Sequence, residues 1–281
     1  MKFNKSLIAA TAVLMFAGAA NAASEVLTLE AGAVVESNAR TFGSLDGSGT
    51  LSFSKLLITA LNLASVGMQA VPDATLQIST STNAAGAVKY VSASAAAPVT
   101  ALTFGFDGTT FDVRGVGTHG GSLQTTAKNS ATNGTGSLSI SDLRVDLATK
   151  TIYADIEGAN GVGIKNDYAL WTYDAISGPV SFTLDPLSAA PVNLSSTNTL
   201  SGLFLVKATD IDDIFVKALN LNNTGRSGIN AVNNRTATNT AGFGSITSTI
   251  SVSAVPEPST YAMMGVGLVG LALFGRRRAA R

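Results

Sequence analysis

The chain has one histidine, His119, and no cysteine, which limits the catalytic and metal sites it can build. A Ser-His-Asp site would need His119, but this residue lies in the glycine-rich stretch GVGTHGGS, without a G-x-S-x-G nucleophile motif nearby. We interpret His119 as a solvated loop residue. Histidine-built zinc sites, thiolate metal sites and a cysteine nucleophile are excluded by the same counts.

Acidic residues form two groups in which carboxylate chemistry could be sought. Asp210 to Asp213 reads DIDD, and calcium binds carboxylates, but the glycine and terminal glutamate of an EF-hand loop do not follow. We expect Asp210 to cap a helix instead, with Asp212 and Asp213 in its first turn. The second group could furnish a glycosidase pair, although the wet face of a hairpin carries such residues anyway. It consists of Asp142, Asp146, Asp155 and Glu157. We predict no metal ion and no cofactor.

The stretch ALWTYD holds the best candidate for a binding surface. Trp171 and Tyr173 are two residues apart, so in a strand they face the same way, roughly 7 Å apart between Cα atoms. Such a pair could form an aromatic platform that contacts carbohydrate. The alternative, a buried pair in the core, is the interpretation we favour, because Trp171 is the only tryptophan in the chain.

Composition favours a β-rich body and argues against nucleic acid as a partner. Six of the 18 basic residues lie in the two terminal segments, so the body from Ala23 to Val255 holds 12 basic and 17 acidic residues. Nucleic acid binding needs clustered Lys and Arg. Without cysteine there is no disulfide framework, so the core must be held by burial.

The clearest strand pattern runs from residue 134 to 158. Leu138 and Ile140 alternate with serines, and after Ser141 and Asp142 the apolar positions move from even to odd numbers. We therefore predict a β-bulge near Ser141 and Asp142, then a turn at ATKT and a second strand. In this hairpin we expect Val145 and Ile156 in the core. We expect Asp146 and Glu157 in solvent.

An earlier stretch resembles this hairpin. GSGTLSFSKLLITAL, residues 47–61, aligns without a gap with GTGSLSISDLRVDLA, residues 134–148. We interpret the two as related β units that share a strand-bulge-strand arrangement. Residues 210–221 are the only stretch with a helical pattern, and residues 115–135 and 221–240 are predicted loops. Further strands are predicted at 75–79, 87–92, 99–107, 169–173, 180–184, 200–207 and 244–253.

Many short strands with few helices indicate a mostly β fold, an antiparallel β-sandwich or jelly roll. We assign this ectodomain to residues 23–254. Whether it forms one large sandwich or two smaller ones is left open by the pattern.

The first 22 residues have the zones of a secretory signal peptide. Lys2 and Lys5 precede the apolar run of residues 6–20, and the small residues of AANA place the cut after Ala22. We therefore predict an exported protein.

Residues 255–281 form three zones. The stiff stretch Val255, Pro256, Glu257, Pro258 and Ser259 comes first. An uncharged run from Tyr261 to Phe274 follows, and we predict a short transmembrane helix there. Basic residues close the chain, and the positive-inside rule keeps them in the cytoplasm. They are Arg276, Arg277, Arg278 and Arg281.

This tail resembles the PEP-CTERM sorting signal of Gram-negative bacteria. The resemblance implies a transient encounter with an exosortase, a membrane-embedded protease that processes the tail near Pro256-Glu257-Pro258. It also implies brief anchoring in the inner membrane, followed by a place at the cell surface or outside the cell. Proteins with this tail belong to cells that make exopolysaccharide and biofilm. The resemblance covers about 25 residues and gives no chemistry for the ectodomain.

The leading interpretation is a non-enzymatic surface or matrix protein with a structural or adhesive role, and exopolysaccharide as its possible partner. The alternative is a secreted polysaccharide-active hydrolase or a carbohydrate-binding protein. We also expect Pro256-Glu257-Pro258 to be an extended, exposed linker outside the folded body.

Overall fold

The computed structural model describes residues 24–186, 188 and 190–256. Its strands join in one sixteen-stranded sheet, and the pairs along the sheet are antiparallel. The expectation of a mostly β, antiparallel fold is confirmed. The predicted signal peptide and transmembrane helix lie outside the described residues.

The first eight strands are β1 (Glu25–Glu30), β2 (Val34–Ser37), β3 (Arg40–Phe53), β4 (Gly67–Ala70), β5 (Thr75–Thr82), β6 (Val88–Phe106), β7 (Thr110–Thr118) and β8 (Gly121–Thr126). The other eight are β9 (Gly136–Asp146), β10 (Thr151–Gly158), β11 (Gly163–Thr172), β12 (Ala175–Ser177), β13 (Ser181–Thr183), β14 (Val192–Ser201), β15 (Phe204–Leu205) and β16 (Gly244–Pro256). The helices are α1 (Lys55–Ala64), the π-helix η1 (Ile211–Val216) and α2 (Asn223–Asn233).

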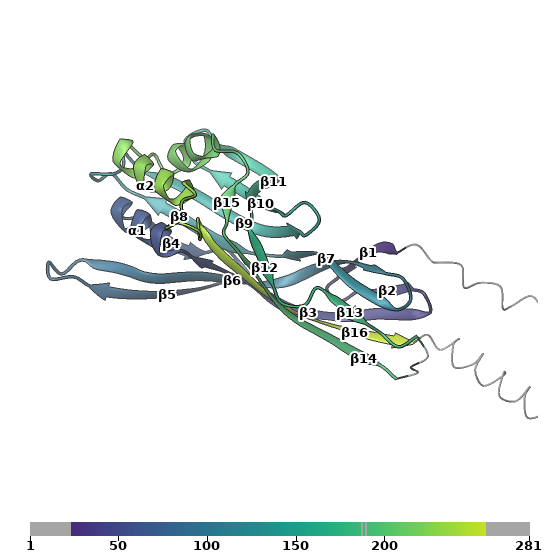
Figure 1. The fold of residues 1–281 in the computed structure, drawn as a ribbon. Helices are drawn as coiled ribbons and strands as arrows, with labels where there is room; N and C mark the ends of the chain where they lie inside the picture. The colour runs from purple at the N-terminus through teal and green to yellow at the C-terminus, as the bar shows by residue number, and fades with distance from the viewer. Residues whose placement is uncertain (1–23, 187, 189, 257–281) are drawn as a thin grey trace, which may run out of the picture.

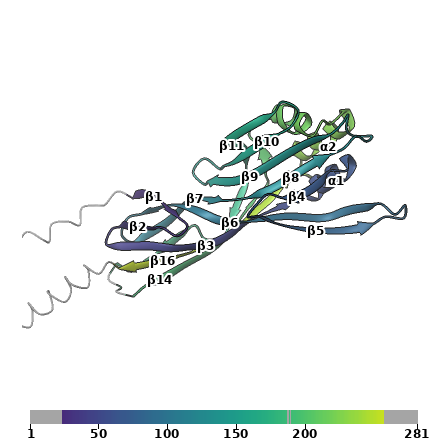
Figure 2. The ribbon, with the colours of Figure 1, turned by 180° about the vertical axis from the view of Figure 1, so that it is seen from behind.

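Strand β6 joins the two halves of the sheet. Its first half pairs with β5 and β3, and its second half pairs with β1 and β7. The exchange of partners falls at Pro98 and Val99, where β3 ends its pairing and β7 begins. The body is elongated, with α1 and α2 at one end and both β1 and the end of β16 at the other (Figures 1 and 2).

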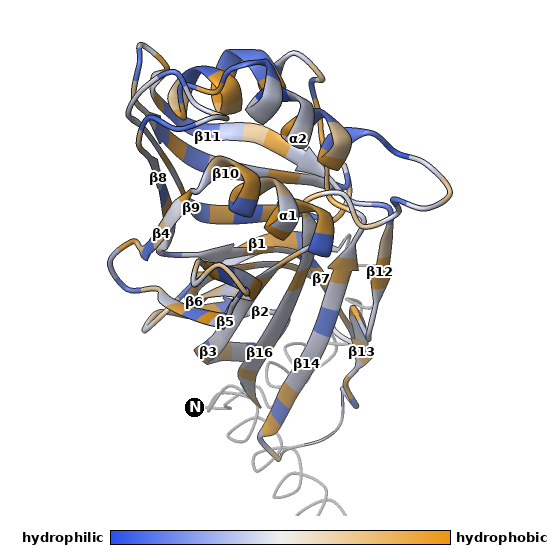
Figure 3. Ribbon diagram, turned by 90° about the vertical axis from the view of Figure 1, so that its left-hand side faces the viewer, coloured by the Kyte–Doolittle hydropathy of each residue, from blue (hydrophilic) through white to orange (hydrophobic). Residues whose placement is uncertain are grey.

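Two apolar clusters form the core. The first lies at the helical end, where the helices pack over β9 and β10 (Figure 3). The second lies toward the other end and is built around stacked phenylalanines. Phe104 and Phe111 stack with ring centroids 4.5 Å apart, and Phe42 lies 5.0 Å from Phe104.

Helix α1 overturns the expected similarity between residues 47–61 and 134–148. After Phe53 the chain forms a helix rather than a bulge and a second strand. The side chain of Ser54 caps this helix by accepting a hydrogen bond from the N–H of Leu57 at 3.1 Å. Leu57, Ile58 and Leu61 then repeat at helical spacing and are all buried. The aligned residues after Ser141 contain arginine and aspartate, which do not give this apolar stripe.

The two predicted loops are also wrong in part. Residues 115–135 include the last four residues of β7 and all of β8, although they are rich in glycine. Glycine is required there because strands approach closely: a Cβ on Gly115 would lie 2.7 Å from the carbonyl oxygen of Val145. Residues 221–240 include α2, capped by Asn222, whose side chain accepts from the N–H of Thr224 at 3.0 Å.

The predicted bulge is confirmed. Arg144 pairs with Tyr153, and Ser141 pairs with Asp155, so two residues of β9 lie opposite the single residue Ala154 of β10. Asp142, one of these two, has a φ of 52°. Val145 and Ile156 are buried, and Glu157 is exposed, as expected. Asp146 is half-buried rather than fully in solvent.

The predicted helix at residues 210–221 is present as η1 and the turn that follows it. Among the described residues, no helix has both the length and the apolar composition needed to cross a bilayer.

Candidate functional site

The end of β16 is where the described body meets the segment that resembles a sorting signal. Strand β16 continues to Pro256 and pairs with β3 from its first residue to its last, with one irregularity in register between Ser251 and Ser253. Ala254 is fully buried, and Val255 faces Thr41 of β3. The sheet therefore continues into the first two residues of the predicted tail.

Pro256 is a correction to the expected exposed linker. It is extended, but it is buried in the sheet opposite Arg40. The pairing of β14 with β16 has already ended at Ala254, so at Pro256 the described sheet continues on the β3 side alone. An edge position of this kind tolerates a residue without an N–H. Glu257, Pro258, Ser259 and Arg276 to Arg278 lie outside the described residues.

Arg40 holds this end of the sheet to a nearby loop. Its side chain is buried, and its Nη2 donates to the carbonyl oxygen of Asp185 at 2.5 Å and to that of Ser188 at 3.4 Å. Residues far apart in the sequence therefore meet where the sorting segment leaves the sheet.

Trp171 and Tyr173 are both buried in the first core cluster rather than exposed on a surface. Trp171 is 2% exposed and packs against Phe243 with ring centroids 5.8 Å apart, while Tyr173 is 4% exposed. A ring buried to this extent offers neither face to a sugar. Of the two interpretations that the sequence left open, this arrangement matches the core pair.

His119 lies in the short connection between β7 and β8, and its side chain is 56% exposed. Its Nδ1 lies 3.0 Å from Asp142 Oδ1, and its Nε2 lies 3.3 Å from Asp73 Oδ2. Both ring nitrogens face carboxylates, so neither faces a serine hydroxyl as in a Ser-His-Asp site. The N–H of Gly120 also donates to Asp142 Oδ1 at 2.7 Å. The cluster ties the bulge of β9 to two neighbouring turns.

Asp146 and Asp155, two of the carboxylates considered for a glycosidase pair, have separate structural roles. Asp155 accepts from the N–H of Asp167 at 2.7 Å, and Asp146 accepts from the N–H groups of the turn that follows it. Burial acts to raise the pKa of Asp146, but the hydrogen bonds from Thr149 and Ala148 outweigh it, so the pKa is lowered. A general acid needs the opposite shift.

The DIDD residues divide between the core and the surface. Asp210 is buried and accepts from the hydroxyl of Tyr168 at 2.8 Å, rather than capping the helix as expected. Asp212 forms a two-pronged ion pair with Arg226, at 2.6 Å for each contact. Within the described residues no group of three His, Cys, Asp or Glu side chains is arranged to hold a metal ion.

A polar surface on the outer face of β9, β10 and β11 was not foreseen. The guanidinium of Arg144 lies 3.9 Å from the ring centroid of Tyr153 and forms a two-pronged ion pair with Asp167, at 2.8 Å for each contact. Tyr168 on the neighbouring strand is not part of this surface: it lies opposite the buried Ala154, packs against the first core cluster and faces the helical side, near Lys165 and Lys207. Period-two alternation places Arg144 and Tyr153 outward, but cross-strand register is needed to bring Asp167 to them, and the bulges alter that register.

Comparison with known proteins adds one finding. No curated protein and no solved structure matches the chain. Residues 254–278 match the family model described as the PEP-CTERM protein-sorting motif, and this match confirms the resemblance seen in the sequence. The chain therefore carries a PEP-CTERM protein-sorting motif that begins inside the last strand of its sheet, and this motif indicates an exported protein sorted by an exosortase.

Proposed function

We propose that this protein is a non-enzymatic component of the cell surface or of an exopolysaccharide matrix, with a structural or adhesive role. The observation that supports this proposal is the sorting motif at residues 254–278, joined without a spacer to a large β body. In this proposal the two halves of the sheet form a sandwich-like ectodomain, which is anchored briefly in the inner membrane and then processed near Pro256-Glu257-Pro258.

The surface that fits an adhesive role best is the outer face of β9, β10 and β11. Part-exposed Tyr153 supplies ring surface, and Arg144 and Asp167 supply planar polar groups that can bind sugar hydroxyls. These residues replace Trp171 as the candidate contact, because Trp171 is buried.

Two tail variants test the sorting part of the proposal. Deleting Arg276 to Arg278 should leave the chain unretained in the membrane, because the cytoplasmic stop is removed. Changing Pro256, Glu257 and Pro258 to alanine should leave the chain unprocessed at full length. Cell fractionation with immunoblotting reads both. If both variants are located and sized as the wild type is, the tail does not direct sorting.

A polysaccharide-active hydrolase is the alternative function. The test is to incubate the purified protein with the polysaccharide of its own cells and to assay new reducing ends. We expect none. Reducing ends that disappear when Asp155 and Glu157 are changed to Asn and Gln would replace our proposal with the enzymatic one.

A further inference from the structure

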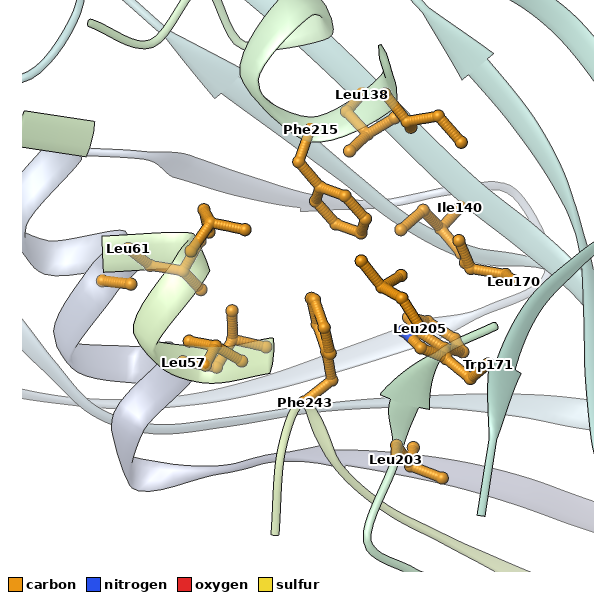
Figure 4. Close-up of a cluster of buried hydrophobic side chains, with 14 of the residues drawn as sticks. Leu57, Leu61, Leu138, Ile140, Leu170, Trp171, Leu203, Leu205, Phe215 and Phe243 are labelled. Carbon is orange, nitrogen blue, oxygen red and sulfur yellow. The ribbon is translucent and has the colours of Figure 1, made fainter. Parts of the chain in front are cut away.

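The first core cluster encloses a cavity of about 40 Å³ between the helices and the sheet. Its walls are mainly apolar and include Leu57, Leu138, Phe215 and Phe243, several of which are drawn in Figure 4. The side chains of Gln124, on β8, and Trp171, on β11, also line it.

These two polar side chains each leave one group without a partner in the protein. Gln124 is 7% exposed; its Nε2 donates to Ser122 Oγ at 2.7 Å, but its Oε1 has no hydrogen-bond partner. Trp171 is 2% exposed, and its indole Nε1 also has none. An unpaired buried polar group is destabilising, so a ligand that satisfies both groups would be held firmly.

The chemistry of the two groups identifies the ligand. Nε1 of Trp171 can only donate, and Oε1 of Gln124 can only accept, so the ligand must do both. A buried water needs about 10–15 Å³ of such space, so 40 Å³ holds about two or three waters and no larger molecule. We propose that this cavity is a binding site for ordered water, which links the indole of Trp171 to the amide of Gln124.

The same arrangement recurs in a second cavity, of about 50 Å³, which shares Leu51, Ser122 and Ile140 with the first. Asn198 and Ser248 stand opposite each other on β14 and β16, and both line this second cavity. Asn198 Oδ1 and Ser248 Oγ are buried without a partner in the protein. The polar groups of the two cavities place water along the boundary between the two halves of the sheet. This inference does not depend on the proposed function.

Because Trp171 is the only tryptophan, nitrogen-15 labelled protein gives one indole N–H signal in a proton–nitrogen NMR spectrum. We expect a cross-relaxation peak between this proton and water. Gln124→Met keeps the side-chain length and removes the acceptor, so the peak should fall several-fold. Gln69→Met is the matched control, because Gln69 is exposed on the neighbouring strand β4, and its peak should equal that of the wild type.

A high-resolution crystal structure of the wild type is a second test of the proposal, and it does not require the variants to fold. We expect water density within hydrogen-bond distance of both Trp171 Nε1 and Gln124 Oε1. The proposal is overturned by a wild-type indole proton without a water peak, by an unchanged peak in Gln124→Met, or by xenon entering the wild-type cavity, since dry apolar cavities take up xenon.

Discussion

Asp142 occupies the extra position in the bulge of β9, and its carboxylate accepts from Gly120 N–H and lies beside His119. A φ of 52° is tolerated by aspartate and asparagine better than by other residues with a side chain. The residue therefore serves two purposes. It allows the backbone conformation at which the inward-facing positions of β9 change from even to odd residue numbers, and it ties the bulge to the connection between β7 and β8.

Substitutions at Asp142 separate these two purposes. Asp142→Ala loses the acceptor and strains the backbone, so we expect it to lower the free energy of unfolding by about 2 kcal/mol. Asp142→Asn keeps an acceptor and tolerates the backbone, so its loss should be under about 1 kcal/mol. Asp142→Gly should fall between them, and urea denaturation gives all three values. Equal losses for Ala and Asn would contradict the role of the acceptor.

Asp210 makes a pH-dependent contribution to stability. Burial is the main cause that raises its pKa, and the hydrogen bond from Tyr168 and the charge of Lys207 oppose that shift only in part. A carboxyl whose pKa is raised by folding contributes stability below its unfolded pKa, and that contribution is lost as the pH rises through the folded pKa. Buried ionised Asp210 is thus a cost at neutral pH.

We therefore expect Asp210→Asn to unfold at a higher temperature than the wild type at pH 7. The difference should shrink as the pH falls below the unfolded pKa of aspartate, about 3.9. Thermal unfolding followed by circular dichroism across this range measures it. Asp46→Asn, at an exposed position on β3, should show no such trend. A difference that grows toward acid pH would reverse our assignment.

Helix α1 depends on its first residues as much as on its apolar face. Ser54 Oγ accepts from Leu57 N–H and donates to the carbonyl oxygen of Gly242 at 2.6 Å, so one hydroxyl joins the helix to the segment before β16. The helix in turn covers the first core cluster.

Ser54→Ala should lower the free energy of unfolding by about 1–2 kcal/mol, because the helix loses its cap. Ser54→Thr keeps the hydroxyl and should lose much less. Guanidinium denaturation of the two variants gives the comparison. A Thr variant as unstable as the Ala variant would mean that packing around Ser54, rather than its hydrogen bonds, is decisive.

Local patterns predicted the elements whose burial follows from near neighbours in the sequence. The bulge at Asp142 could be predicted because the apolar positions move from even to odd residue numbers between Ile140 and Val145, within a few residues. Strand β8 could not be predicted in this way, because the sequence shows that Gly121 lacks a side chain but not why a side chain is excluded there. The reason is tertiary: a Cβ there would lie 2.1 Å from the carbonyl oxygen of Ile140, on a strand 19 residues away.

The candidate sites also divide into those visible in a contiguous stretch of sequence and those that depend on tertiary contacts. The sorting motif could be read from the sequence because it is contiguous, and its match is independent of the fold. The contact of Arg144 with Tyr153 and Asp167 depends on the register of three strands, and the neighbours of His119 come from the bulge of β9 and from the turn at Asp73. Sequence separation hid these clusters, although each residue type was visible.

The arrangement of the described body bears on how the sorting segment is presented. Strand β1 and the end of β16 lie at the end away from α1 and α2 (Figure 1). Pro256 is the last described residue, and it is already part of the sheet. We therefore expect processing to occur next to the folded body, with no spacer, so that the mature chain ends close to the last strand.

Intact-mass measurement of the protein recovered from the surface or medium of wild-type cells tests this account most directly. We expect a single chain that begins at Ala23 and ends close to Pro256-Glu257-Pro258, without Arg276 to Arg278. Full-length protein should be found only in the membrane fraction and should be short-lived in a pulse-chase experiment. Recovery from the surface or medium of a form that still ends in Arg281 would contradict the account, because the tail would then be an anchor and not a processed sorting signal.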